Sequence, residues 1–230
     1  MAAWLRLGNV SALAAQAPDA QSWMSAGERA RLAAMPATQR RAQFVAGRWL
    51  ARMLLAHAFG GSWRDWSLSD GADAPPQARG PVPASLSISH SKALVACAVG
   101  HGMLGLDLEP VRARRGLDEL YTAITTEAER AALAAHVAPA DAVHRFAHAW
   151  TLKEAGIKRH GGGLFATMLG HALTIAPSCA PHADACTWLH GGQVLALCAA
   201  DVANLDLPGI AATPQYWRLL RDGASVPGGV

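Results

Sequence analysis

One short segment restricts the fold more than any other part of the chain. The run Leu104-Gly-Leu-Asp-Leu-Glu109 alternates strictly between leucine and a small or acidic residue. Alternate side chains of a β-strand point to opposite faces, so we expect the leucines on one face and Asp107 and Glu109 on the other. At about 4 Å and an effective dielectric of about 20, two such carboxylates repel each other by about 4 kcal/mol. The run therefore predicts a core strand whose acidic face needs an offsetting interaction.

A bound divalent cation is one way to offset that repulsion. Mg²⁺ takes oxygen ligands from one or two carboxylates and leaves its other positions to water and phosphate. The alternative is an edge strand with a solvated acidic face, because Asp-x-Glu is a weak motif by itself.

The second half also contains a helix with its own charged flank, predicted over Ala140–Lys158 and ended by Gly161-Gly162-Gly163. At about 100° per residue, an apolar-edged stripe contains Phe146, Trp150, Lys153 and Ile157. Glu154 and Lys158 lie one turn apart on its flank. They form either a surface ion pair worth a few tenths of a kcal/mol or a half-buried pair at a cleft edge. The second arrangement would place a metal-linked carboxylate beside a cation.

Composition narrows the class of protein. The 230 residues are 51% hydrophobic and 16% charged, which excludes wholesale disorder. A net charge of +3 is too small to indicate a nucleic-acid partner. We find no signal peptide, no apolar run long enough for a membrane span, and too few cysteines for a disulfide framework. We therefore expect a cytoplasmic protein with no membrane partner.

Helices and strands alternate with short turns in two halves, 1–100 and 101–230, which predicts an α+β fold. In the first half we expect helices near Ala26–Met35 and Thr38–Phe59 and strands over Ser85–His90 and Leu94–Val99. In the second we expect, besides the segments above, a helix over Thr126–Ala135 and strands around Leu173–Ala176, Cys186–His190 and Val194–Ala199. Each half has an apolar strand with a cysteine, Cys97 or Cys198, which weakly suggests a duplication. The tail from Pro208 shows no strong periodicity.

Two further patterns carry phosphate-binding residue types. The strand Leu86–Ser91 places His90 on the face of Ile88, and its serines on the other face. His90 is either an ordinary strand-end histidine or a phosphate contact. On the long first helix, Arg41, Arg48 and Arg52 fall within about 40° of one another. They form either a solvated basic face or a ladder for phosphates, which guanidinium groups bind in a bidentate way.

Taken in order, Ser87–Ser91, Gly105–Glu109 and Phe146–Leu164 resemble the signature of the 4'-phosphopantetheinyl transferase superfamily, in its larger two-half, surfactin-synthetase-activating class. The family pattern is a Ser-His-Ser strand, a Gly-x-Asp-x-Glu strand, and a Trp-[Ser/Thr]-x-Lys-Glu-[Ala/Ser]-x-x-Lys helix that runs into Gly-x-Gly-Leu. Here the helix block reads Trp150-Thr-Leu-Lys-Glu-Ala-Gly-Ile-Lys158, and Glu154 follows Asp107 by 47 residues. The resemblance covers roughly residues 40–200.

The resemblance implies a monomer of two similar α+β halves related by a pseudo-two-fold axis, with the active site in the cleft between them. Residues 1–100 would contact the phosphates of coenzyme A, and residues 101–230 would hold the metal carboxylates and the catalytic helix. Mg²⁺ would be held by Asp107, Glu109 and Glu154. The catalytic residues would be Glu154, Lys158 and His90, and coenzyme A would contact Arg41, Arg48, Arg52, Ser89, His90 and Lys158.

One departure concerns the family's Gly-Lys-Pro loop. The corresponding segment, 71–76, has no lysine, so Arg79 or the backbone would have to make that contact. The implied reaction moves the 4'-phosphopantetheine arm of coenzyme A to a serine of an apo acyl or peptidyl carrier protein and releases 3',5'-ADP. The alternatives are a metal-dependent phosphodiesterase or nuclease, and a coenzyme A-binding module without turnover. The sequence does not select a fatty-acid, polyketide or peptide-synthetase carrier.

Overall fold

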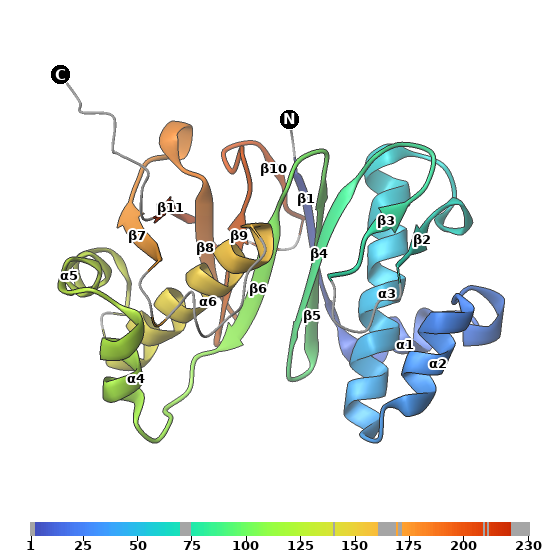
Figure 1. The fold of residues 1–230 in the computed structure, drawn as a ribbon, viewed down its shortest axis with the longest axis horizontal. Helices are drawn as coiled ribbons and strands as arrows, with labels where there is room; N and C mark the ends of the chain where they lie inside the picture. Colours follow the sequence, from blue (N-terminus) through green and yellow to red (C-terminus); the bar gives the residue numbers. More distant parts are fainter. Residues whose placement is uncertain are drawn as a thin grey trace.

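Two β-sheets with a long helix packed on each form the framework of the molecule (Figure 1). The structure is a computed structural model, and it describes residues 3–69, 75–139, 141–160, 169, 172–208, 210 and 212–221. The first sheet has the order β10 (Leu205–Asp206), β1 (Ala3–Asn9), β5 (Leu94–Gly100) and β4 (Ser85–Ser91). The second has the order β6 (Gly105–Pro110), β9 (Gln193–Cys198), β8 (Ala185–His190), β11 (Gln215–Arg221) and β7 (Leu173–Pro177). The α+β class predicted from the sequence is confirmed.

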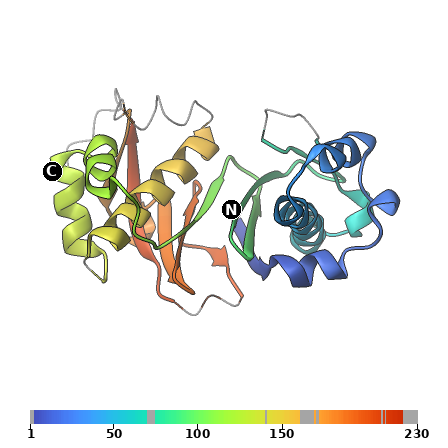
Figure 2. The same ribbon diagram turned by 90° about the horizontal axis from the view of Figure 1, so that it is seen from below.

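The first sheet packs against α3 (Thr38–Phe59), whose bounds agree with the prediction. Alternate residues of β5 face this helix, so Cys97 is buried in a core with Leu50 and Leu54 of α3. Two shorter helices, α1 (Val10–Gln16) and α2 (Ala26–Ala34), contact α3 from outside the sheet. A small hairpin of β2 (Ser67–Leu68) and β3 (Ala78–Arg79) completes this half. Figure 2 shows α3 end-on beside the first sheet.

The second sheet packs against α6 (Ala142–His160), the helix that the sequence predicts over Ala140–Lys158. The predicted stripe is buried: Phe146, Trp150, Lys153 and Ile157 are each at most 9% exposed. This stripe faces α4 (Leu117–Ile124) and α5 (Glu127–His136), which lie at the left of Figure 1: Phe146 packs on Tyr121 of α4, and Lys153 contacts Glu129 of α5. Thr126 caps α5, because its side chain accepts a hydrogen bond from the Glu129 N–H.

The two sheets meet where β4 lies beside β6, and side chains make the junction. The hydroxyl of Ser87 accepts a hydrogen bond from the Leu106 N–H at 3.0 Å, and the Ser89 hydroxyl accepts one from the Leu108 N–H at 3.2 Å. The serines of β4 therefore face β6, while Ile88 lies on the face that packs on α3. Leu106 and Leu108 share a core with residues of both sheets, which confirms the predicted leucine face.

Several elements lie where the sequence predicts none. The tail contains β11, which pairs with β7 and β8 and buries Trp217. The second half also supplies β10, which pairs with β1, so the first sheet contains chain from both predicted halves. The segments 71–74 and 161–164, where the sequence points to a loop and a glycine run, lie outside the described residues. Among the helices that the structure describes, none has the length and apolarity needed to cross a membrane.

Candidate active site

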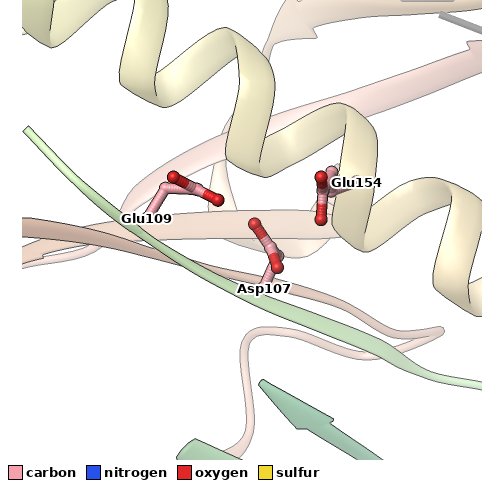
Figure 3. Close-up of side chains that lie close together, drawn as sticks. All are labelled: Asp107, Glu109 and Glu154. Carbon is pink, nitrogen blue, oxygen red and sulfur yellow. The ribbon is translucent and has the colours of Figure 1, made fainter. Parts of the chain in front are cut away.

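The three predicted metal-binding carboxylates lie together between β6 and α6. Asp107 and Glu109 point from the same face of β6 toward α6, which supplies Glu154 (Figure 3). One ligand oxygen from each carboxylate lies within 4.8 Å of the other two. Asp107 is buried, whereas Glu109 and Glu154 are half-buried. The period of two on the strand and the position of Glu154 on the helix thus place three acids around one point.

Gly105 allows α6 to come this close to β6. A Cβ atom on Gly105 would lie 2.0 Å from the carbonyl oxygen of Ala155 and 2.4 Å from the backbone nitrogen of Arg159. Real Cβ atoms do not approach backbone atoms at such distances, so any side chain here would push the helix away. The glycine that precedes Asp107 therefore determines how near Glu154 lies to the strand.

Two cations sit beside the three acids. The Lys158 Nζ lies 2.6 Å from Oδ1 of Asp107 and 3.6 Å from Oε2 of Glu154. The Arg114 guanidinium donates to Oε2 of Glu109 at 2.8 Å. Its other contacts are with the rings of Phe146 and Trp150, whose centroids lie 5.2 and 5.7 Å away.

The acids remain mutually repulsive in spite of these cations. Burial, and next the charge of Asp107, raise the pKa of Glu154 to about 7, although Lys158 acts in the opposite direction. Burial and Asp107 also raise the pKa of Glu109, against the effect of Arg114. Without a further positive charge, the cluster therefore favours a proton on Glu154 near neutral pH.

One orphaned atom shows that the residues fit a metal ion. Among the residues that the structure describes, the buried Oδ2 of Asp107 has no hydrogen-bond partner, whereas Oδ1 accepts from both Ser89 and Lys158. A buried carboxylate oxygen without a partner is costly. A hard divalent cation such as Mg²⁺ would give that oxygen a ligand role and would offset the repulsion among the three acids.

A cavity of about 260 Å³ opens beside the carboxylates. Its lining residues are Arg40, Ile88, Ser89, His90, Asp107, Leu108, Glu109, Glu154 and Lys158. A second cavity of about 160 Å³ lies along α3, and its lining includes Arg31, Phe44, Arg48 and Pro76. Arg40, Ile88 and His90 line both cavities, so the two adjoin. An anionic ligand could extend from the carboxylates, through a bound cation, to the arginines of α3.

His90 and Arg40 stand where the two cavities meet. Arg40 donates to Nε2 of His90 at 2.7 Å, so this nitrogen acts as an acceptor. Burial, and next the charge of Arg40, lower the pKa of His90 to about 4. His90 is therefore neutral at pH 7. The sequence motifs point to His90 and not to Arg40. A signal for Arg40 exists, because one face of the helix holds four residues at an i, i+4, i+7, i+8 spacing: Arg40, Phe44, Gly47 and Arg48.

The predicted arginine stripe does not form one surface. Arg41 is exposed and lines neither cavity. Arg48 lines the second cavity but is only 4% exposed, donates to the Ser69 carbonyl at 2.7 Å and lies 3.4 Å from Oε1 of the buried Glu28. Arg52 is 1% exposed and donates twice to the Glu28 carboxylate, at 3.1 and 2.7 Å. This corrects the prediction for Arg52, whose guanidinium faces a buried glutamate and no cavity.

Ser89 also has a different role from the predicted phosphate contact. Its hydroxyl hydrogen is donated to Oδ1 of Asp107 at 3.0 Å, and its oxygen accepts from the Leu108 N–H. Ser89 therefore orients Asp107 and joins the two sheets, although it also lines the cavity. Arg79, the suggested substitute for the missing lysine, is exposed in β3 and lines neither cavity beside His90.

Residues 103–198 match the sequence profile of the 4'-phosphopantetheinyl transferase superfamily. The matched segment is less than half of the chain, and over it the chain is similar to that superfamily. The matched segment contains all three carboxylates and Lys158, whereas Arg40 and His90 precede it. No curated protein sequence matches the chain.

Solved structures of holo-acyl-carrier-protein synthases resemble part of the chain. One is from Bacillus anthracis str. Ames, in complex with CoA (3',5'-ADP), with 20% identity over 43% of this chain and 92% of its own, and a TM-score of 0.37. The other is from Thermotoga maritima, with 17% identity over 46% of this chain and 67% of its own, and a TM-score of 0.32.

Proposed function

We propose that the chain transfers the 4'-phosphopantetheine arm of coenzyme A to a serine of an apo acyl or peptidyl carrier protein, with Mg²⁺, and releases 3',5'-ADP. The observation that carries the proposal is the placement of Asp107, Glu109 and Glu154 around an orphaned oxygen, in a segment that matches the superfamily. The adjoining cavities add cationic and neutral donors for phosphates along α3.

The three carboxylates would hold the metal ion, with Asp107 as the most buried ligand. When bound, Mg²⁺ neutralises negative charge on a pyrophosphate. Lys158 contacts Asp107 and Glu154 from the cavity side, so its ammonium can donate to the phosphate oxygen that leaves as part of 3',5'-ADP. A lysine suits this role because its ammonium is a compact donor with rotatable protons.

Glu154 would accept the proton of the attacking hydroxyl. As the serine oxygen bonds to the β-phosphorus, the phosphorus–oxygen bond to the departing nucleotide breaks, and the hydroxyl proton passes to Glu154 directly or through a water. The cation would also keep the Glu154 carboxylate ionised, which a proton acceptor requires. Much of the remaining acceleration would come from positioning and fixed charge.

Coenzyme A would extend along the two cavities, with its phosphates near Lys158, His90 and Arg40. Neutral His90 accepts from Arg40 at Nε2, and its Nδ1 lies 3.2 Å from the same guanidinium nitrogen, so His90 would orient Arg40 toward a phosphate oxygen. Arg48 lies deeper in the second cavity. These three α3 and β4 side chains replace the full arginine ladder that the sequence suggests.

We also propose that the chain belongs to the two-half class, with residues 1–100 and 101–230 as similar halves that act as a cytoplasmic monomer. The element order supports this proposal. The first half runs β1-α1-α2-α3 and then, after β2 and β3, β4-β5, and the second runs β6-α4-α5-α6 and then, after β7, β8-β9. In each half the first strand pairs antiparallel with the last strand of that series.

Mass spectrometry of carrier proteins tests the reaction. The purified chain is mixed with coenzyme A, Mg²⁺ and a panel of apo carrier domains from fatty-acid, polyketide and peptide synthetases, and the mass of each carrier is measured. We expect at least one carrier to gain the mass of the phosphopantetheine arm, and none to gain it with EDTA. A folded protein that modifies no carrier would refute the proposal. Nicking of plasmid DNA with Mg²⁺ would instead support a nuclease.

A further inference from the structure

Lys153 is a buried cation whose side chain points away from the candidate active site, although it neighbours Glu154 in sequence. Its side chain is 0% exposed, and its Nζ lies 2.9 Å from Oε1 of Glu129 on α5. The ammonium also donates to the Ile124 carbonyl at the end of α4. The pKa of Lys153 is lowered by burial, and the Glu129 charge offsets this effect only in part. A lysine ammonium is removed from water at this depth only where paired groups compensate.

Glu129 joins this lysine to three separate segments. Oε2 accepts a hydrogen bond from the Thr126 N–H at 2.7 Å, which completes the capping box of α5. Oε1 accepts from the Ile175 N–H of β7 at 2.9 Å, in addition to its contact with Lys153. The carboxylate therefore ties the middle of α6 to the start of α5 and to the far edge of the second sheet.

The first half contains the same arrangement at the same spacing. Ser25 and Glu28 form the capping box of α2, as Thr126 and Glu129 do for α5. Glu28 is 0% exposed and binds Arg52 of α3. Arg52 follows Glu28 by 24 positions, and Lys153 follows Glu129 by 24 positions.

A neighbouring contact repeats as well. Arg29 donates to the Met24 carbonyl, and Arg130 donates to the Thr125 carbonyl, in each case five residues back. Each of these two contacts recurs in the other half with the same sequence spacing. The buried ion pair is therefore a feature that both halves share.

We propose that the Glu129–Lys153 ion pair is a positioning device that fixes the rotation of α6 about its own axis, and so holds Glu154 at the distance from Asp107 and Glu109 that a shared metal ion needs. Consecutive residues of a helix are about 100° apart, so an anchored Lys153 fixes the direction of Glu154. At about 6 Å from the axis, a rotation of about 20° moves a side-chain end by about 2 Å. That displacement is large beside the 4.8 Å within which the three ligand oxygens lie.

Glu28 contacts both Arg52 and Arg48 of α3, and by the same reasoning these contacts set the rotation of α3 and hence the direction of Arg40 toward the cavities. Arg52 is then a positioning residue for coenzyme A contacts, as Lys153 is for the metal ligands. The inference about Lys153 rests on the metal site of the proposed function, and the inference about Arg52 rests on its coenzyme A site.

Direct metal binding tests the first pair without any transfer reaction. Mn²⁺ serves as a spectroscopic substitute for Mg²⁺, and the electron paramagnetic resonance signal of free Mn²⁺ gives its affinity for the full-length chain. We expect Lys153→Met to weaken Mn²⁺ binding by about tenfold or more, as loss of an outer contact to metal ligands typically does. Lys153→Arg, which supplies the cation that the first half uses, should stay within about threefold of the wild type. If Lys153→Met does not fold, Lys153→Gln takes its place.

Arg52→Met is the matched control, because it breaks the equivalent buried pair on the other long helix. It should lower the melting temperature as Lys153→Met does, yet leave the Mn²⁺ affinity unchanged and raise the KM for coenzyme A. Equal loss of Mn²⁺ affinity in both variants, or a folded Lys153→Met with wild-type affinity, would overturn the inference. A wild type that binds Mn²⁺ but modifies no carrier refutes the proposed transfer, and the Mn²⁺ comparison still decides the role of Lys153.

Discussion

Glu154 experiences the largest conflict between burial and charge among the three site carboxylates. Its pKa is raised to about 7 by burial and by Asp107, so replacing it with a neutral amide removes a repulsion. We expect Glu154→Gln to lower the transfer rate at least 100-fold, a loss on the scale of a missing general base, and to leave the melting temperature without Mg²⁺ unchanged or higher. Glu127→Gln, an exposed change on α5, is the control. Retained transfer by Glu154→Gln would remove this residue from the mechanism.

The same pKa gives a stability that depends on pH. A carboxyl group whose folded pKa lies above its ordinary value of 4.5 binds more protons in the folded state between pH 4.5 and about 7. In EDTA, the contribution of Glu154 to stability is therefore fully present below pH 4.5 and is lost as the pH rises to about 7. We expect Mg²⁺ to raise the melting temperature more at pH 8 than at pH 6.

His90 changes the stability of the fold with pH in the direction opposite to Glu154, and over an overlapping range of pH. The pKa of His90 is lowered from 6.5 to about 4, so its contribution is present above pH 6.5 and is lost as the pH falls toward 4. Both the wild type and Glu154→Gln contain His90, so the difference between their melting temperatures at each pH removes the contribution of His90. A difference that does not change between pH 4.5 and 7 would contradict the raised pKa of Glu154.

Arg40 and Arg41 are adjacent in sequence but differ in position. Arg40 lines both cavities and contacts His90, whereas Arg41 lines neither. We expect Arg40→Ala to raise the KM for coenzyme A about tenfold, as loss of one charge-assisted contact of roughly 1.5 kcal/mol would, and to leave the Mg²⁺ concentration for half-maximal rate unchanged. Steady-state kinetics of Arg40→Ala and Arg41→Ala measure which arginine contributes to coenzyme A binding. A larger rise in KM for Arg41→Ala than for Arg40→Ala would contradict the structure.

Which site residues the sequence reveals depends on how local their arrangement is. Asp107 and Glu109 share a strand face and Glu154 lies on a helix flank, so periodicity makes them candidates, and the family resemblance assigns them to one metal site. Arg52 shows the limit, because its partner Glu28 lies on another helix and no pattern in the sequence links them before the structure is known. For that reason the sequence places Arg52 with Arg41 and Arg48 on one exposed basic face of the helix.

At the scale of elements, the contact between β6 and α6 positions the site. Gly105→Ala would bring a Cβ atom against the backbone of α6. We expect a loss of stability on the order of 1–3 kcal/mol, as for other overpacked positions, together with weaker Mg²⁺ binding because Glu154 moves from Asp107. Gly102→Ala is the control, since nothing lies within 4 Å of its Cβ position. Urea unfolding with and without Mg²⁺ measures both effects, and equal behaviour of the two variants would contradict the close contact.

The elements that the sequence predicts well have a clear period or clear ends. The bounds of α3 agree with the prediction, because a long pattern runs into Gly60. By contrast, β1 and β11 carry apolar residues on both faces, such as Tyr216 and Trp217, so neither shows a period of two. Their pairing partners lie far away in sequence, and tertiary contacts alone define them.

At the scale of the molecule, two serine hydroxyls join the sheets. Ser87→Ala leaves the buried N–H of Leu106 without its acceptor, which costs about 1–3 kcal/mol. We expect faster hydrogen exchange at the Leu106 amide and a lower free energy of unfolding, measured by exchange mass spectrometry and by urea unfolding. Ser67→Ala, on the exposed small hairpin, should change neither. An unchanged Leu106 amide in Ser87→Ala would show that the hydroxyl is dispensable.

The pairing of β10 with β1 has a consequence for how the chain is made. Asp206 bonds Arg6 across 200 residues of sequence, and Leu205 pairs with Ala3. On the ribosome, β1 emerges long before its outer neighbour exists. An unpaired strand edge is a template for pairing with other chains. The nascent first half therefore exposes an aggregation-prone edge until the residues around 206 have been synthesised. A chaperone would have to shield the edge of β1 for all of that time.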